Sequence, residues 1–383
     1  MSGWVGNILL LASIQGFLLT VFLLFSKNNI KANRVLSVTM FFLSLDLLSV
    51  YSFAAGWYKT YPVIFGANFG FPFIYGPIFY LYAKFITGKE ENFSAKYLVH
   101  FIPFLLAHLY VSPFYFLSEQ EKIKQISVYI SDLQIDLIAI SAFKPIHGLI
   151  YTLYSLKLLK EFNAQIKNSY SNIEKKKLDW LRNLILGVTI IWLIVAFTFV
   201  YTTMFGLGYS ASNEIIYFSV AIFIYAVGYG ALYQPEMFAK SEKSIYAAEK
   251  VAEETPQQEK YSKSNLSESQ IEEIKTKLIS LMENKKDFLN SELTIDQLAL
   301  EIGVSKHNLS ETINTAFQKN FYDFINNYRV EEFKRRIKNP DYANYSLLAI
   351  AFESGFSSKS SFNTIFKKHT GSTPSEYRKK SSD

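Results

Sequence analysis

The sequence has no cysteine in 383 residues, which excludes disulfide frameworks, thiolate metal sites and thiol nucleophiles. Charge is also scarce in its first part. Residues 1–235 hold 17 Lys and Arg and 11 Asp and Glu, whereas the shorter stretch 236–383 holds 22 of each. One apolar part and one polar part in a chain of this length indicate at least two domains and exclude a single soluble domain.

Enzyme signatures are missing as well. The sequence has no H-E-x-x-H, no Gly-rich loop ending in Gly-Lys-Ser/Thr, no G-x-S-x-G and no kinase signature. We therefore predict no catalytic residue, no metal site and no cofactor. A membrane enzyme with catalytic groups on separate helices, or a transporter with an appended regulatory DNA-binding domain, remains the alternative.

Long uncharged runs are what the first part contains. The run from Trp4 to Phe25 is 22 residues long, enough to cross about 30 Å of hydrocarbon. A cleaved signal peptide is disfavoured, because no basic segment precedes this run and similar runs follow it. We predict seven transmembrane helices, at Trp4–Phe25, Val35–Trp57, Pro62–Ile86, Tyr97–Leu117, Leu133–Leu156, Leu181–Phe205 and Ile215–Tyr233.

Basic residues in the connections indicate the orientation, because Lys and Arg resist translocation and stay in the cytoplasm. The first, third and fifth connections, with the span ends beside them, hold 13 of them, and the second, fourth and sixth hold 3. This bias predicts a multi-pass protein with its N-terminus outside and its C-terminal part in the cytoplasm.

The fifth predicted span contains ionisable residues, which are costly inside a membrane unless they are paired or face water. The spacing of Asp136, Lys144 and His147 puts them near one helix face. We predict that this face, with Asp46 of the second span, lines a pocket for an unidentified signal ligand from outside. A polar lock between helices, with Pro145 as a kink, is an equal alternative.

Residues 236–265 are polar and mixed in charge, so they cannot bury enough apolar surface to fold alone. We predict a linker here, between a membrane domain at 1–235 and a second domain at 266–383. Alternatively, residues 241–254 form a helix that transmits rotation or dimer contacts.

Helical spacing resumes after the linker. Capping boxes at 267–270 and 294–297 each open a helix. The second of these helices ends at Gly303, and Ser305 opens the next one. The same design, two helices joined by a short turn with glycine, recurs at 346–366 after one long helix. Two helix-turn-helix units in tandem are much more specific than one.

The second repeat contains a dense motif, made of Ile350-Ala351-Phe352-Glu353-Ser354-Gly355-Phe356, Phe362, Phe366-Lys367-Lys368, Gly371, Thr373-Pro374 and Tyr377-Arg378. With these residues, 267–380 resemble the AraC-type DNA-binding domain along its whole length. The resemblance implies a bacterial protein that binds promoter DNA and contacts RNA polymerase. It also implies two recognition helices in successive major grooves, about 34 Å apart.

Carried over by position, the resemblance places base-facing side chains on both recognition helices. Glu311 and Thr364 depart from the family, in which arginine is common at both positions. Lys367 and Lys368 are expected to hold phosphates, which position the domain without reading sequence. For each of these residues a merely solvated helix face is the alternative. The predicted DNA contacts are His307, Ser310, Glu311 and Asn314 in the first helix and Lys359, Ser360, Ser361, Thr364, Lys367 and Lys368 in the second.

The sequence as a whole predicts an all-α, one-component transcription regulator in the bacterial inner membrane. Seven transmembrane helices precede an AraC-like domain whose two helix-turn-helix units share a long helix. A signal that binds one state of the membrane domain more tightly than another would change DNA binding. Proteolytic release at the linker is a variant of this mechanism. The expected partners are promoter DNA, the lipid bilayer, the signal ligand, RNA polymerase and, as an open alternative, a second copy of the chain.

Overall fold

A computed structural model of the chain describes residues 3–26, 30–90, 92–131, 135–174, 176–205, 209–233 and 266–382. These residues are helical or in loops and turns, apart from one isolated β-bridge between Tyr170 and Thr294. The chain divides into two compact units. The predicted linker at 236–265 lies outside the described residues.

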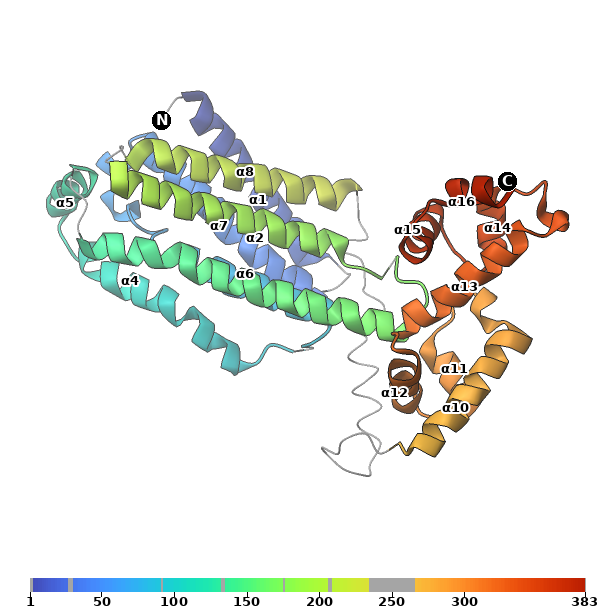
Figure 1. Ribbon diagram of the computed structural model, residues 1–383. Coiled ribbons are helices and arrows are strands. Elements are labelled where there is room, and N and C mark those ends of the chain that lie inside the picture. The colour runs from blue at the N-terminus through green and yellow to red at the C-terminus, as the bar shows by residue number, and fades with distance from the viewer. Residues whose placement is uncertain are drawn as a thin grey trace. The chain divides into compact units, whose positions relative to one another are not determined.

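The first unit is built from residues up to 160 and from 178 onward. Its helices are long because apolar side chains continue for several turns, and a helix bonds its own backbone groups in an apolar surrounding. Helix α1 packs against α2 and α8, α2 packs against α3, and α7 packs against α8. These helices, visible in Figure 1, are α1 (Gly3–Phe25), α2 (Ile30–Ala54), α3 (Pro72–Thr87), α4 (Ile102–Tyr115), α5 (Glu119–Ser131), α6 (Ile135–Ser169), α7 (Asp179–Phe205) and α8 (Tyr209–Tyr233).

Among the described residues, five helices are long and apolar enough to cross a membrane, fewer than the seven spans predicted. They correspond to the first, second, fourth, fifth and sixth predictions. Their bounds are Trp4–Phe25, Ile30–Ala54, Ala95–Tyr115, Asp136–Ser169 and Asp179–Phe205, and the third of these joins a 3-10 helix at Ala95–Phe101 to α4.

The third predicted span, Pro62–Ile86, is too long as stated. Its first part forms turns and a short 3-10 helix at Pro62–Ile64, and α3 begins only at Pro72. Proline fits the first turn of a helix, where its missing N–H has no intrahelical partner to lose. The resulting helix has 16 residues, short of the about 20 needed to span the hydrocarbon.

The seventh predicted span lies on α8. This helix has 25 residues, and Glu214–Gly230 form an apolar stretch within it. A further helix, α5, lies between the fourth and fifth predicted spans, where the sequence suggested only a polar connection. It carries Glu119 and Glu121 in its first turn, where negative charge interacts favourably with the positive end of the helix dipole.

The second unit contains the predicted tandem repeat, and its helix starts are those expected from the sequence. The hydroxyls of Ser267 and Thr294 accept from backbone N–H groups three residues later, which confirms both capping boxes. Ser305, Ser346 and Ser358 cap their helices in the same way. The helices are α10 (Glu268–Ser280), α11 (Ile295–Ile302), α12 (Lys306–Phe317), α13 (Phe321–Ile337), α14 (Leu347–Glu353), α15 (Lys359–Thr370) and α16 (Pro374–Ser382).

Helix α13 contributes to both hydrophobic cores of this unit. Phe321 and Phe324, near its start, belong to the core of α10, α11 and α12. Val330 and Phe333, two turns later, belong to the core of α14 and α15. Each fully buried side chain of this size stabilises the fold by about 1.5–3 kcal/mol. One rigid helix therefore joins the two helix-turn-helix units.

Candidate nucleic-acid interface and membrane-domain cavity

The first candidate recognition helix is α12, the second helix of its pair. Leu309 and Ile313 are fully buried, so the opposite side of α12 is the one open to DNA. The side chain of His307 is 85% exposed and Asn314 is also exposed, whereas Ser310 and Glu311 are only partly so. Glu311 lies 3.7 Å from His307 on the next turn.

The second candidate recognition helix is α15, which buries Phe362, Ile365 and Phe366. Six of the predicted contacts lie here. Lys368 is already engaged, because its Nζ donates to Asp323 Oδ1 of α13 at 2.7 Å. Of the predicted contacts on α15, Lys359, Ser360, Thr364, Lys367 and Lys368 are exposed and Ser361 is partly buried.

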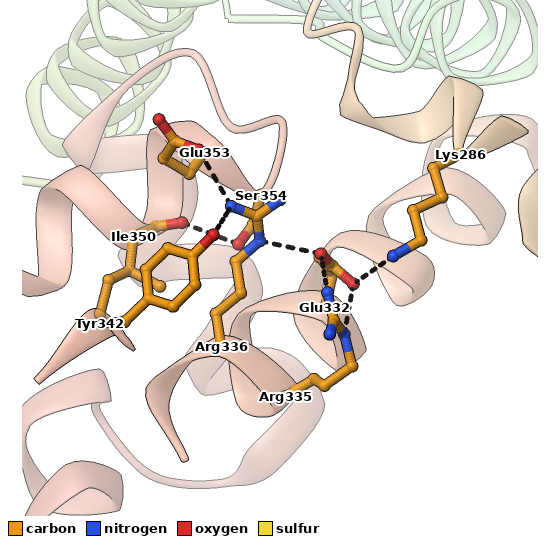
Figure 2. A network of polar contacts seen from close by, with 8 residues as sticks. All are labelled: Lys286, Glu332, Arg335, Arg336, Tyr342, Ile350, Glu353 and Ser354. Atoms are coloured by element: carbon orange, nitrogen blue, oxygen red, sulfur yellow. Dashed lines mark hydrogen bonds and ion pairs between the residues drawn. The ribbon is translucent and has the colours of Figure 1, made fainter. Parts of the chain in front are cut away.

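A polar network ties α13 to both helix-turn-helix units (Figure 2). Glu332 of α13 is 5% exposed and accepts from Arg335 and Arg336, at 2.6 and 2.8 Å. Lys286, from the loop before α11, lies 3.6 Å from the same carboxylate. Burial alone would raise the pKa of Glu332, but the two arginines outweigh it and hold the pKa at about 2.

The network continues toward the second helix-turn-helix unit. Arg336 Nη1 donates to Glu353 Oε2 of α14 at 3.0 Å and to the Tyr342 hydroxyl at 2.7 Å. Figure 2 shows both partners beside the guanidinium. With its bond to Glu332, the planar guanidinium of Arg336 thus contacts three side chains at once, which a single lysine ammonium is less suited to do in a fixed geometry.

The two helix-turn-helix units also meet at a glycine. Gly355, in the turn between α14 and α15, has φ +91°, and a Cβ there would lie 2.5 Å from the backbone oxygen of Phe288. Phe288 precedes α11 in the first helix-turn-helix unit, so only glycine permits this approach. The close contact helps to set the distance between α12 and α15.

Arg329 of α13 fills the same junction. Its side chain is 2% exposed and its guanidinium donates to the backbone oxygens of Phe288 and Asn290, each at 2.8 Å. Burial lowers the pKa of Arg329 to about 10, and these carbonyl oxygens compensate for the lost hydration. Local sequence patterns carried no sign of this residue's role.

Arg329 also donates to residues 161–177, which we call the connecting segment. This segment comprises the end of α6 and the start of the connection to α7, and it packs within the second unit. Arg329 donates to the backbone oxygen of Ser171 at 3.1 Å and to its hydroxyl at 3.0 Å. The Ser171 hydroxyl in turn donates to the backbone oxygen of Leu293 at 2.7 Å.

Two more contacts hold the connecting segment to the helix-turn-helix units. Asn172 Nδ2 donates to Glu292 Oε1 at 2.9 Å, just before α11. The hydroxyl of Ser358 donates to the carboxylate of Glu174. Because Ser358 is the N-cap of α15, Glu174 places a negative charge at the N-terminus of the second recognition helix. Backbone N–H groups at a helix N-terminus favour anions in general.

The first unit contains a cavity of about 370 Å³. Of the four residues predicted for a signal pocket, Asp46 and Lys144 line it. Asp46 accepts from Asn68 Nδ2 at 2.6 Å and from the Tyr75 hydroxyl at 2.9 Å. Neither Asn68 nor Tyr75 was singled out from the sequence, because neutral polar residues in a span carry no distinctive signal.

The other two predicted pocket residues lie elsewhere. Asp136, in the first turn of α6, is exposed and accepts from the Tyr110 hydroxyl of α4. His147 is buried among aromatic rings, with those of Phe73 and Tyr151 at 5.5 and 4.9 Å. The structure therefore brings together two of the four residues.

Comparison with known proteins addresses the second unit. The family described as Helix-turn-helix domain matches residues 298–380. An uncharacterized HTH-type transcriptional regulator of Staphylococcus aureus (strain COL) is 32% identical over 89 residues, 23% of this chain and 12% of that protein. The probable transcription factor PqrA of Proteus vulgaris is also 32% identical over 89 residues, which are 70% of its length.

A solved structure, that of a protein of unknown function from Listeria innocua, has 27% sequence identity and a TM-score of 0.25. It covers 28% of this chain and 95% of its own. The match spans only about an eighth of the length of the Staphylococcus relative.

Two helix-turn-helix units on one shared helix define a DNA-binding domain with paired recognition helices. This chain belongs to the AraC-type helix-turn-helix transcriptional regulators, and the resemblance seen in its sequence is confirmed for residues 298–380. The named relatives are transcriptional regulators, which agrees with DNA as the partner of the second unit.

Proposed function

We propose that this protein is a membrane-tethered, one-component transcription regulator, in which a signal sensed by the membrane domain changes promoter binding. In this proposal residues 1–235 form a multi-span membrane sensor, 236–265 a linker and 266–383 the DNA-binding domain. Five long apolar helices and the bias of basic residues support a multi-pass protein with its N-terminus outside and its DNA-binding domain inside.

The observation that carries the coupling is the pair of hydrogen bonds from Arg329 to Ser171. Ser171 lies between α6 and α7, two of the long apolar helices, and only two residues beyond the end of α6. A change in α6 or α7 therefore reaches the junction of the two helix-turn-helix units along the chain. The linker at 236–265 is not needed for this route.

The position of Glu174 supports a direction for the coupling. While Ser358 donates to Glu174, a carboxylate occupies the N-terminus of α15 and competes with a DNA phosphate. Withdrawal of the connecting segment would remove this charge. In the proposed mechanism the signal favours the state in which Glu174 has left α15.

For DNA readout we propose the exposed side chains of α12 and α15. Lys359 is suited to guanine O6 and N7, and the hydroxyls of Ser360 and Thr364 can pair with several bases. Lys367 is proposed to hold a phosphate, and Lys368 to do so only when it leaves Asp323. Residues 291–383 hold 13 Lys and Arg against 11 Asp and Glu, so weak non-specific affinity is expected.

The experiment is to tag the full-length protein, cross-link it to DNA in living cells, purify the membrane fraction and sequence the bound DNA. Enrichment of a few discrete promoters would support the proposal. Sites recovered only with residues 262–383 would favour gating by the membrane part or proteolytic release. No enrichment with either form would move the weight to a transporter or membrane enzyme with an appended regulatory domain.

Proteolytic release makes a separate prediction within the same experiment. It requires a soluble C-terminal fragment that appears when the target promoter responds. A protein that stays full-length in the membrane during the response would exclude release and favour coupling through the connecting segment.

A further inference from the structure

The cavity of the first unit has the size and composition of a ligand site. Its volume of about 370 Å³ falls within the range of about 300–1,000 Å³ typical of small-molecule pockets. Most of its wall is apolar, with contributions from Phe79, Val195 and Phe199, and Trp192 provides one large aromatic face. An occupant with a mainly apolar body fits this wall.

One charged group in the cavity, the Lys144 ammonium, forms no direct ion pair among the described residues, although Asp46 lines the same cavity. The Lys144 ammonium makes a cation–π contact with the ring of Phe69, whose centroid lies 4.1 Å from Nζ. No ion pair joins Lys144 to a carboxylate in that part of the chain, Asp46 included. A cation–π contact offsets only part of the cost of removing an ammonium from water, so an anion is favoured beside it.

The carboxylate of Asp46, in contrast to the Lys144 ammonium, already has direct polar partners. Each of its two carboxylate oxygens already accepts a hydrogen bond, Oδ1 from Asn68 and Oδ2 from Tyr75. Its negative charge also limits what else the cavity can hold. A phosphate monoester would add up to two negative charges beside one lysine and one aspartate, whereas a carboxylate adds one.

We propose that this cavity binds an amphipathic molecule with one carboxylate, whose charged end meets Lys144 and whose apolar body lies along α7 against Trp192. The proposed binding site is argued from the cavity and its lining residues alone. Only the further claim that this molecule is the signal rests on the proposed function.

The test uses the full-length protein in nanodiscs of zwitterionic lipid and measures quenching of Trp192 fluorescence by brominated ligands. Bromine quenches tryptophan at short range, and the difference from the Trp192→Phe variant isolates the signal of the cavity. Brominated decanoate should quench with saturation. Brominated decanol, with the same body and no charge, should bind at least about tenfold more weakly.

Variants separate the charge from the shape of the site. Lys144→Met should weaken decanoate binding by about tenfold or more and leave decanol unchanged. Val195→Phe retains Lys144 but fills the cavity, and it should abolish saturable quenching by either ligand. Asp136→Asn, on α6 but outside the cavity, should change neither.

Equal binding of acid and alcohol, or tighter binding of brominated decylammonium, would overturn the proposal. So would wild-type affinity for decanoate in a folded Lys144→Met variant. A promoter reporter distinguishes this failure from failure of the proposed function. Binding that depends on Lys144 without a change in the reporter leaves the ligand class standing and removes its signalling role, whereas a reporter response that Lys144→Met retains overturns the ligand class alone.

Discussion

The guanidinium of Arg329 donates hydrogen bonds to the backbone oxygen and the hydroxyl of Ser171, a residue 158 positions earlier in the chain. Arg329 belongs to the helix shared by two helix-turn-helix units, and Ser171 belongs to the connection between two apolar helices. The same guanidinium bonds Phe288 and Asn290 in the first helix-turn-helix unit. One buried cation therefore joins the connecting segment to the DNA-binding domain.

Replacing Arg329 with methionine should strongly destabilise this junction. Methionine fills similar space but leaves the acceptors at Ser171, Phe288 and Asn290 without their donor, which should cost about 3 kcal/mol. Hydrogen exchange of the α13 amides in the full-length protein should then be about a hundredfold faster. The control Lys334→Met removes an exposed pair with Glu331 and should have little effect. Unchanged exchange in Arg329→Met would show that the junction does not depend on these bonds.

Removing the carboxylate of Glu174 should tighten DNA binding, because it lies at the N-terminus of α15 through Ser358. In Glu174→Ala the affinity of the full-length protein in nanodiscs should rise by about 1 kcal/mol, measured by fluorescence anisotropy. Glu268→Ala is the matched control, since it removes the same charge from the first turn of α10. Equal effects of both variants would mean that net charge alone matters.

Gly355→Ala should disturb the spacing of the recognition helices. Its Cβ would meet the backbone oxygen of Phe288 at 2.5 Å, and backbone cannot move aside as a flexible side chain can. Gly303 occupies the corresponding turn of the first helix-turn-helix unit, also with positive φ, but nothing lies within 4 Å of a Cβ there.

Both alanine variants incur backbone strain of about 1 kcal/mol, so the difference between them measures the contact. Gly355→Ala should lose specific DNA binding, while Gly303→Ala should retain most of it in the same anisotropy assay. Similar losses in the two variants would contradict a role for the Gly355 contact in setting the helix spacing.

Lys359 and Lys367 should behave differently although they share α15. Lys359→Ala should relax preference at one base position by about 1–3 kcal/mol. Lys367→Ala should weaken binding to all sequences alike and flatten the salt dependence by about one unit. Anisotropy titrations against a set of single-base variants at several salt concentrations provide the measurement. Identical profiles would refute the division into base and phosphate contacts.

Glu332 should make the DNA-binding domain sensitive to acid. Its folded pKa of about 2 lies below the ordinary 4.5, so its contribution to stability is complete above pH 4.5 and is lost as pH falls toward 2. Urea titrations of residues 262–383, followed by circular dichroism, should show this decline. Glu332→Gln should have a lower free energy of unfolding at neutral pH. Its free energy of unfolding should also change less with pH across the acid range. A wild-type slope in that variant would assign the decline to other groups.

The parts of the fold that could be predicted from the sequence are those that depend on interactions within a few residues. Ser267, Thr294 and Ser305 cap helices through backbone groups three residues away, so their roles are encoded within one helical turn. The apolar runs predicted five of the long helices for a similarly local reason. The predicted bounds of the third span were wrong because α3 begins only at Pro72, a boundary that hydropathy averaged over a window does not detect.

The sites depended on contacts that no local pattern encodes. Spacing along α6 grouped Asp136, Lys144 and His147, but the neighbouring helices decided which cavity or ring each side chain met. Lys368 reads as a phosphate contact in sequence, and its bond to Asp323 of α13 appears only when the two helices pack.

By itself the sequence determined most of the long helices, the tandem helix-turn-helix units and the AraC-type family, since capping and apolar periodicity act over a few residues. Only the tertiary structure decided that the connecting segment joins the DNA-binding domain and that Asp46 and Lys144 share a cavity. These relationships depend on directions of side chains from helices far apart in the chain, which are fixed when buried donors such as Arg329 find acceptors during packing.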